Sequence, residues 1–207
     1  MNKICMICSH CCSGSDFLYS AMNDHPRIQG YFSGTYNYYE NPQSLLNLTS
    51  NDHKLSNRAA VYMDHILFNY QISTKNIYKN CDFIYVIREP YYVLHEMVLK
   101  LKYKPEHALN YYSYRLRRIC EMAKKTPNGL LLLWEDLISG RASEMVSTYM
   151  SLDDKIDFNP ELLKNSLCES NISLAKEIDK AEKKYEKYIF WIKNNTSVKY
   201  WGKDEKI

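Results

Sequence analysis

Residues 82–90 read Asp-Phe-Ile-Tyr-Val-Ile-Arg-Glu-Pro. The run from Phe83 to Ile87 is continuously apolar, which is typical of a strand buried on both faces of a sheet. Arg88 ends the run, and Pro90 stands where proline favours the first turn of a helix. The stretch therefore predicts a buried strand over Asp82–Ile87, followed directly by a helix.

Two more apolar runs have the same character: residues 3–8 (KICMIC) and residues 130–134 (LLLLW). Spacing of apolar residues and capping signals predict helices between and after them. These helices are expected at residues 16–22, 55–69, from 90 onward, 105 to about 125, and 172 to about 194. Residues 30–50 show no sustained period and predict a loop. Strands alternating with helices indicate an α/β fold, with a parallel sheet flanked by helices.

Length and composition limit the function classes. The chain has 207 residues, 45% hydrophobic and 25% charged, which fits a single globular domain over residues 1–207 with a helical part from about residue 140. A net charge of +3 argues against a nucleic-acid partner. No apolar run approaches the roughly 20 residues that span a bilayer, so no membrane partner is expected. The apolar start of the chain is too short for a signal peptide, which predicts a cytoplasmic protein.

Four of the seven cysteines stand in one segment: Cys5, Cys8, Cys11 and Cys12. The spacing resembles a zinc or iron–sulfur run. Cys5 and Cys8 lie in the first predicted strand, however, and residues three apart on a strand point to opposite faces. We expect small buried hydrophobic residues and no metal. A metal-linked or redox-linked cysteine protein is the less favoured alternative.

The loop after the first strand reads Ser-His-Cys-Cys-Ser-Gly-Ser-Asp over residues 9–16. Small residues between a strand and a helix allow successive backbone N–H groups to form an anion nest, which the helix N-terminus reinforces. The loop lacks the GxxxxGK[ST] pattern of a Walker loop. Taken alone, it is equally consistent with a plain strand-to-helix turn.

Arginines are the second candidate phosphate ligands. Arg88 follows a strand and precedes a helix, where a guanidinium can hold a phosphate through two parallel bonds. The alternative is an ion pair with Glu89 or Glu96. Arg115 and Arg118 share one helix face and are either further phosphate contacts or solvated surface residues.

Three motifs in order resemble the P-loop-like sulfotransferase superfamily, which uses 3′-phosphoadenosine 5′-phosphosulfate (PAPS). The family has a strand, a Pro-Lys/Arg-Ser-Gly-Thr-Thr loop and often His-Pro; here residues 11–18 are CCSGSDFL and His25-Pro26 follow. Its Arg-Asp/Asn-Pro motif is matched by Arg88-Glu89-Pro90. Its Tyr/Trp-Glu-Asp-Leu motif is matched by residues 134–137. The resemblance covers about residues 3–140 and implies a P-loop-NTPase-like fold.

The resemblance implies a role for individual residues. The 5′-phosphosulfate would lie in the loop, and Arg88 would bind the 3′-phosphate of PAPS or of its product PAP. The loop residues are Cys12, Ser13, Gly14, Ser15 and Asp16. Two positions depart from the family: Cys12 stands where the loop cation is expected, and Glu96 stands where a serine contacts the 3′-phosphate. If protonated, His10 is the nearest replacement cation.

The resemblance also implies the reaction, which is sulfate transfer from PAPS to a hydroxyl of a carbohydrate or small molecule. Its general base is a Glu or His beyond the loop, and Glu40 fits the carbohydrate-sulfotransferase spacing best. His53, Asp64 and His65 are the other candidates. The departures at Cys12 and Glu96 keep open a non-catalytic relative that binds PAP, another nucleotide or an anion. The motif at residues 134–136 is expected to be structural.

Overall fold

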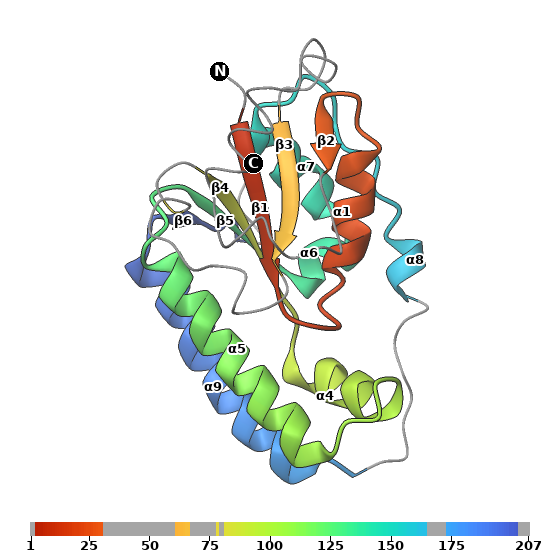
Figure 1. Ribbon diagram of the computed structural model, residues 1–207, viewed down its shortest axis with the longest axis vertical. Helices are drawn as coiled ribbons and strands as arrows, with labels where there is room; N and C mark the ends of the chain where they lie inside the picture. The colour runs from red at the N-terminus through yellow and green to blue at the C-terminus, as the bar shows by residue number, and fades with distance from the viewer. Residues whose placement is uncertain (1–2, 31–60, 67–77, 79–80, 165–172, 203–207) are drawn as a thin grey trace.

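The computed structural model describes residues 3–30, 61–66, 78, 81–164 and 173–202 (Figure 1). The strands in these residues are β1 Lys3–Ser9, β2 Ile28–Gly30, β3 Val61–Ile66, β4 Asp82–Ile87, β5 Gly129–Leu133 and β6 Val198–Lys199. The helices are α1 Ser15–Asn23, α4 Pro90–Leu99, α5 Pro105–Ala123, α6 Trp134–Ile138, α7 Arg141–Met150, α8 Glu161–Lys164 and α9 Ala175–Asn195. No helix among them is both long and apolar enough to cross a membrane.

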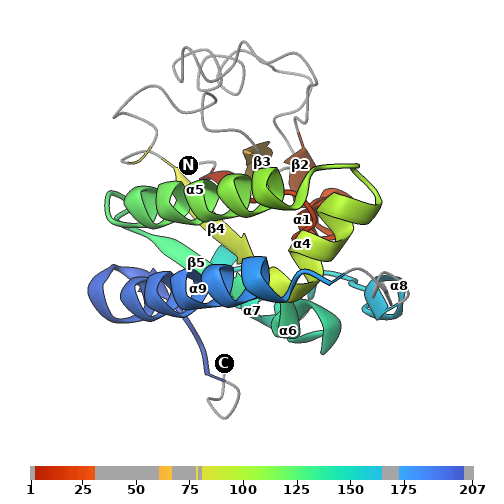
Figure 2. The same ribbon diagram turned by 90° about the horizontal axis from the view of Figure 1, so that it is seen from below.

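The six strands form one sheet in the order β2-β3-β1-β4-β5-β6, and every neighbouring pair is parallel. This confirms the predicted α/β fold with a parallel sheet. Helices α5 and α9 lie side by side along one face, while α1, α6 and α7 lie on the other (Figures 1 and 2). All strands therefore end at the same edge, where a parallel sheet places its ligand site.

The sheet is buried on both faces, as its continuously apolar strands predict. Successive residues of a strand enter opposite cores: Phe83 and Tyr85 pack under α5 and α9, whereas Ile84 and Val86 pack under α1, α6 and α7. Cys8 and Cys5 divide in the same way. The strand prediction for residues 3–8 is therefore confirmed.

The helix predicted over residues 55–69 is wrong where the structure describes it. Residues Val61–Ile66 form strand β3, which pairs with β1 on one side and β2 on the other. Val61 and Met63, two residues apart, enter the same core, which is a strand period and not a helical one. Sheet pairing thus overrides an apolar spacing that fits a helix in isolation. The predicted loop at residues 30–50 lies, except for Gly30, outside the described residues.

The other predicted helices are found with small shifts at their ends. Gly14, not Asp16, is the N-cap of α1, and Asp16 lies in its first turn. Proline is the first residue of both α4 and α5, as predicted. The C-terminal part, predicted as helical, also supplies β6, which extends the sheet beyond β5.

Candidate nucleotide-binding site

The loop between β1 and α1 has two residues in left-handed conformation, Cys12 with φ 61° and Gly14 with φ 81°. A side chain at Gly14 would also place its Cβ 2.5 Å from Cζ3 of Trp134. Position 14 therefore requires glycine for two independent reasons, conformation and space. The resulting tight turn brings the backbone of residues 12–16 to the carboxyl edge of the sheet.

This loop offers unpaired backbone donors. No described residue accepts a hydrogen bond from the backbone N–H of Ser13, Gly14 or Asp16, and no side chain caps α1. Such N–H groups, together with the dipole of the nine-residue helix α1, favour an anion. The Ser13 and Ser15 hydroxyls are not turned outward, because they bond to each other at 3.0 Å. The backbone, not these hydroxyls, is thus the part of the loop whose donors are open to an anion.

Arg88 lies beside the loop and is buried, with 1% of its surface exposed. Its Nη1 donates to the Cys12 carbonyl oxygen at 2.9 Å, which ties the end of β4 to the loop. The guanidinium also stacks on Trp134, 3.9 Å from the ring centroid. The Nε and Nη2 atoms of Arg88 have no hydrogen-bond partner among the described residues. Arg88 therefore both shapes the loop and keeps unused donors.

Glu96 is the ion-pair partner of Arg88, one of the two partners considered for it from the sequence. Its Oε2 lies 3.2 Å from Arg88 Nη1, and its Oε1 lies 3.1 Å from Lys100 Nζ. Burial, together with the nearby Glu96 carboxylate, raises the pKa of Cys12 to about 12. Cys12 is therefore a neutral thiol near an ion-paired carboxylate.

His10 is predicted from the sequence as a replacement cation, and both of its ring nitrogens take part in hydrogen bonds. Nε2 accepts a hydrogen bond from the Arg88 backbone N–H at 3.0 Å, which leaves Nδ1–H to donate to the Cys11 carbonyl at 2.9 Å. Burial and the nearby positive charges of Arg115 and Arg88 together lower the pKa of His10 to about 4. In this arrangement His10 is neutral, and it braces the loop without supplying a positive charge.

A chain of hydrogen bonds runs behind the loop. The Ser9 hydroxyl bonds to Ser15 at 2.8 Å and to Nε2 of His65 at 3.0 Å. His65 Nδ1 lies 3.4 Å from Asp16, and burial lowers the pKa of His65 to about 4. Of the base candidates, His65 and Asp64 are thus at the buried end of β3. Glu40 and His53 lie outside the described residues.

Three further residues have a place in this site. Arg115, left open from the sequence as a phosphate contact or a surface residue, is buried, and its Nε donates to the Ser9 carbonyl oxygen at 2.8 Å, so it supports the loop from α5. Trp134, the first residue of the motif at residues 134–137, covers the Arg88 guanidinium. Lys100, which holds Glu96, did not stand out in the sequence; its local signal is its place four residues after Glu96 on the same helix. Arg118 bonds to Glu121 on its own helix.

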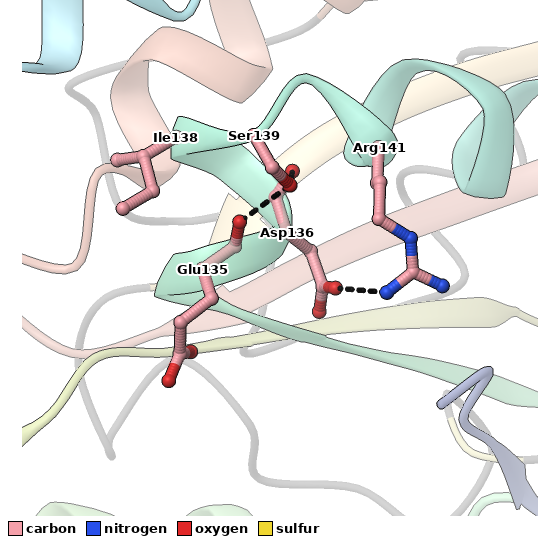
Figure 3. A pocket seen from close by; sticks show the side chains of 5 residues that line it. All are labelled: Glu135, Asp136, Ile138, Ser139 and Arg141. Atoms are coloured by element: carbon pink, nitrogen blue, oxygen red, sulfur yellow. Dashed lines mark hydrogen bonds and ion pairs between the residues drawn. The ribbon is translucent and has the colours of Figure 1, made fainter. Parts of the chain in front are cut away.

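The motif at residues 134–136 fills the structural role predicted for it. Asp136 Oδ2 accepts the Leu133 backbone N–H at 2.9 Å, and Oδ1 lies 3.3 Å from Arg141. A pocket of about 440 Å³ opens beside this motif, and Figure 3 shows Asp136 turned toward Arg141 in it. Nearby, burial and the neighbouring Glu135 raise the pKa of Glu89 to about 7.

Comparison with known proteins gives a result for structure alone. No protein-family model and no curated protein matches the sequence. Several solved structures have a similar fold, and three of them are sulfotransferases. The sulfotransferase domain of a Synechococcus olefin synthase aligns at TM-score 0.57 and 14% identity, covering 89% of this chain and 94% of that one. A sulfotransferase from Alicyclobacillus acidocaldarius aligns at 0.56 and 11% identity, covering 92% and 96%. A mouse sulfotransferase complexed with PAP aligns at 0.51 and 12% identity, covering 94% and 86%. The chain therefore has the sulfotransferase fold, as the order of its motifs predicts.

Proposed function

We propose that the protein is a nucleotide-dependent sulfotransferase, with PAPS as the donor that the resemblance implies and a hydroxyl of a carbohydrate or small molecule as the acceptor. The observation that carries the proposal is the set of backbone N–H groups of Ser13, Gly14 and Asp16, which have no acceptor among the described residues, beside Arg88 on the edge of a sulfotransferase-like sheet. A 5′-phosphosulfate is a ligand of the charge and size that such a loop attracts. The mouse neighbour is itself a PAP complex, which supports a nucleotide at this edge.

The proposed step is a single displacement at sulfur. The acceptor oxygen forms a new S–O bond, the bridging S–O bond to the 5′-phosphate breaks, and the nucleotide leaves with that bridging oxygen. The acceptor proton passes to a general base, for which Glu40 remains the prediction. The unpaired N–H groups would stabilise the charge that develops on the leaving phosphate. Arg88, His10 and Arg115 would keep the loop in the shape that this requires.

A second candidate function is nucleotide binding without transfer. It is favoured by the state of the two residues nearest the leaving group, because Cys12 is a neutral thiol and His10 a neutral imidazole. Neither can supply the cation that the resemblance places in the loop. Transfer of radioactive sulfate from PAPS to a panel of sugars and phenols distinguishes the two candidates, since a binding module would retain the nucleotide without turnover.

Asp16 provides a direct test of phosphate binding. Its side chain is 83% exposed at the first turn of α1, so its replacement should not unfold the protein. A phosphate on the loop would be repelled by this carboxylate, and Asp16→Asn should therefore tighten the binding of AMP or PAP about threefold to tenfold in calorimetry. Asp16→Arg should tighten it further. The exposed Asp179 of α9 gives the control Asp179→Asn, which should change nothing.

The proposal fails if neither nucleotide binds the wild-type protein. It also fails if both nucleotides bind but the Asp16 variants behave like the Asp179 control, because the phosphate would then lie elsewhere.

A further inference from the structure

We propose that Glu96 makes the site select a nucleotide with a free ribose 3′-hydroxyl, of the adenosine 5′-phosphosulfate class, over one that carries a 3′-phosphate. The inference rests on the proposed function, since it concerns the part of the same site where Arg88 would meet the ribose. It goes beyond that function, and departs from the PAPS donor that the resemblance implies, because it assigns the class of the donor nucleotide and the residue that selects it.

The contacts of Glu96 are those of a bound anion. One carboxylate oxygen faces Arg88 at 3.2 Å, and the other faces Lys100 at 3.1 Å. The Glu96 side chain is only 7% exposed, so it is a fixed part of the site and not a surface residue that happens to lie nearby. A carboxylate of the chain itself thus occupies the position at Arg88 that a phosphate would take.

A 3′-phosphate would meet two obstacles here. Its negative charge would be repelled by the Glu96 carboxylate, and juxtaposed like charges are strongly unfavourable in a site removed from water. To reach Arg88 it would have to displace Glu96, which would break the contact of Glu96 with Lys100 as well. Among the described residues, Arg88 and Lys100 are the cations that pair with Glu96, so their charge is already used and does not offset that of a 3′-phosphate.

A 3′-hydroxyl meets neither obstacle. An ionised carboxylate has about four acceptor positions, and Arg88 and Lys100 face one oxygen each, which leaves acceptor capacity for a hydroxyl donor. Dinucleotide-binding folds use the same chemistry, with a carboxylate for a free ribose hydroxyl and an arginine for a phosphorylated one. The Arg88–Glu96 pair therefore corresponds to the hydroxyl form of that choice.

AMP and PAP differ only in the 3′-phosphate, so calorimetric titration with both isolates this position. The affinity of the wild-type protein for AMP should exceed its affinity for PAP by at least about tenfold, as one unfavourable charge contact implies. Glu96→Gln keeps the size of the side chain and removes its charge, so it should shift the affinity ratio toward PAP by about tenfold or more. Glu182→Gln, at an exposed position of α9, is the matched control and should leave the ratio unchanged.

The outcomes separate this inference from the function on which it rests. If wild-type protein binds PAP as tightly as AMP or more tightly, Glu96 does not select and the inference is overturned, while nucleotide binding stands. An unchanged ratio in a folded Glu96→Gln protein also overturns it. If neither nucleotide binds wild-type protein, the proposed function and the inference are both wrong. The wild-type ratio is measured without any variant, so a failure of Glu96→Gln to fold leaves the test intact.

Discussion

The Glu96 carboxylate lies 3.2 Å from the Arg88 guanidinium, and both side chains are withdrawn from solvent. The pair joins α4 to the end of β4, and Arg88 continues the connection to the Cys12 carbonyl in the loop. This ion pair at the edge of the sheet thus helps to hold the conformation of the loop at residues 12–16, where we propose that an anion binds.

The first prediction concerns the stability of this pair. Arg88→Met should lower the free energy of unfolding by about 3–5 kcal/mol, because a buried carboxylate then keeps only the half-exposed Lys100. The double variant Arg88→Met with Glu96→Leu should lose less than Arg88→Met alone, since no unpaired buried charge remains. Urea unfolding measures both. A double variant as unstable as the sum of the two single variants would show that the charges are not coupled.

The second prediction concerns His10 and pH. Its folded-state pKa of about 4 lies below the ordinary value of 6.5, so the unfolded chain binds a proton in this interval that the folded protein does not. Its contribution, about 3 kcal/mol at most, is present above pH 6.5 and is lost as the pH falls toward 4.

Urea unfolding between pH 7.5 and 4.5 tests this contribution. His10→Gln retains an acceptor for the Arg88 backbone N–H but does not titrate, so its stability should fall less steeply over this range than that of the wild type. Identical slopes would contradict a neutral, buried His10. His65 serves as an internal comparison, because burial also lowers its pKa to about 4 and the variant leaves it in place.

The third prediction concerns Glu89, whose pKa shift has the opposite sign. Burial and Glu135 raise its folded-state pKa to about 7, so its contribution to stability is present below pH 4.5 and is lost as the pH rises through 7. Glu89→Gln should therefore stabilise the protein at pH 8, by roughly 1 kcal/mol because the side chain is only half-buried and is screened by solvent.

The same Glu89→Gln substitution should have a smaller effect at pH 4.5, where Glu89 is protonated in the folded wild-type chain and about half protonated in the unfolded one. Thermal unfolding at the two pH values gives the comparison. A variant that is less stable than wild type at pH 8 would contradict the raised pKa of Glu89.

The fourth prediction concerns catalysis and the missing cation. If the protein transfers sulfate slowly because Cys12 is neutral, Cys12→Lys should raise the hydrolysis of a nucleotide 5′-phosphosulfate by up to about 10²–10³-fold. Cys12→Met is the control, because it adds length at the same left-handed position without charge. A fast wild type that Cys12→Lys inactivates would show that this position is not next to the leaving group.

The sequence predicted those parts of the fold in which a strand is buried on both faces. Strands β1, β4 and β5 are continuous apolar runs, and proline marks the start of α4 and α5. Strand β3 was missed because Asp64 and His65 interrupt its apolar character. His65 is bonded by Ser9 of β1, and Asp64 accepts the backbone N–H of His65. Strands β2 and β6 are too short to show a period.

For the site, the sequence indicated which residues meet but not how they pair. The carboxyl ends of parallel strands share one edge, so the loop after β1 and Arg88 after β4 could be placed together from the sequence alone. The sequence left open whether a phosphate, Glu89 or Glu96 meets Arg88. That Glu96 does so, and that His10 is neutral while it bonds to the Arg88 backbone, depends on side-chain orientation and burial, which no local pattern encodes.

We expect the backbone of residues 13–16 to bind the 5′-phosphate of a nucleotide. A crystal structure of the protein with AMP would show this contact. The phosphate should lie within hydrogen-bond distance of the Ser13, Gly14 and Asp16 backbone N–H groups, with the Arg88–Glu96 pair intact and Glu96 facing the ribose. A nucleotide bound elsewhere while the loop stays empty, or no bound nucleotide at saturating concentration, would contradict it.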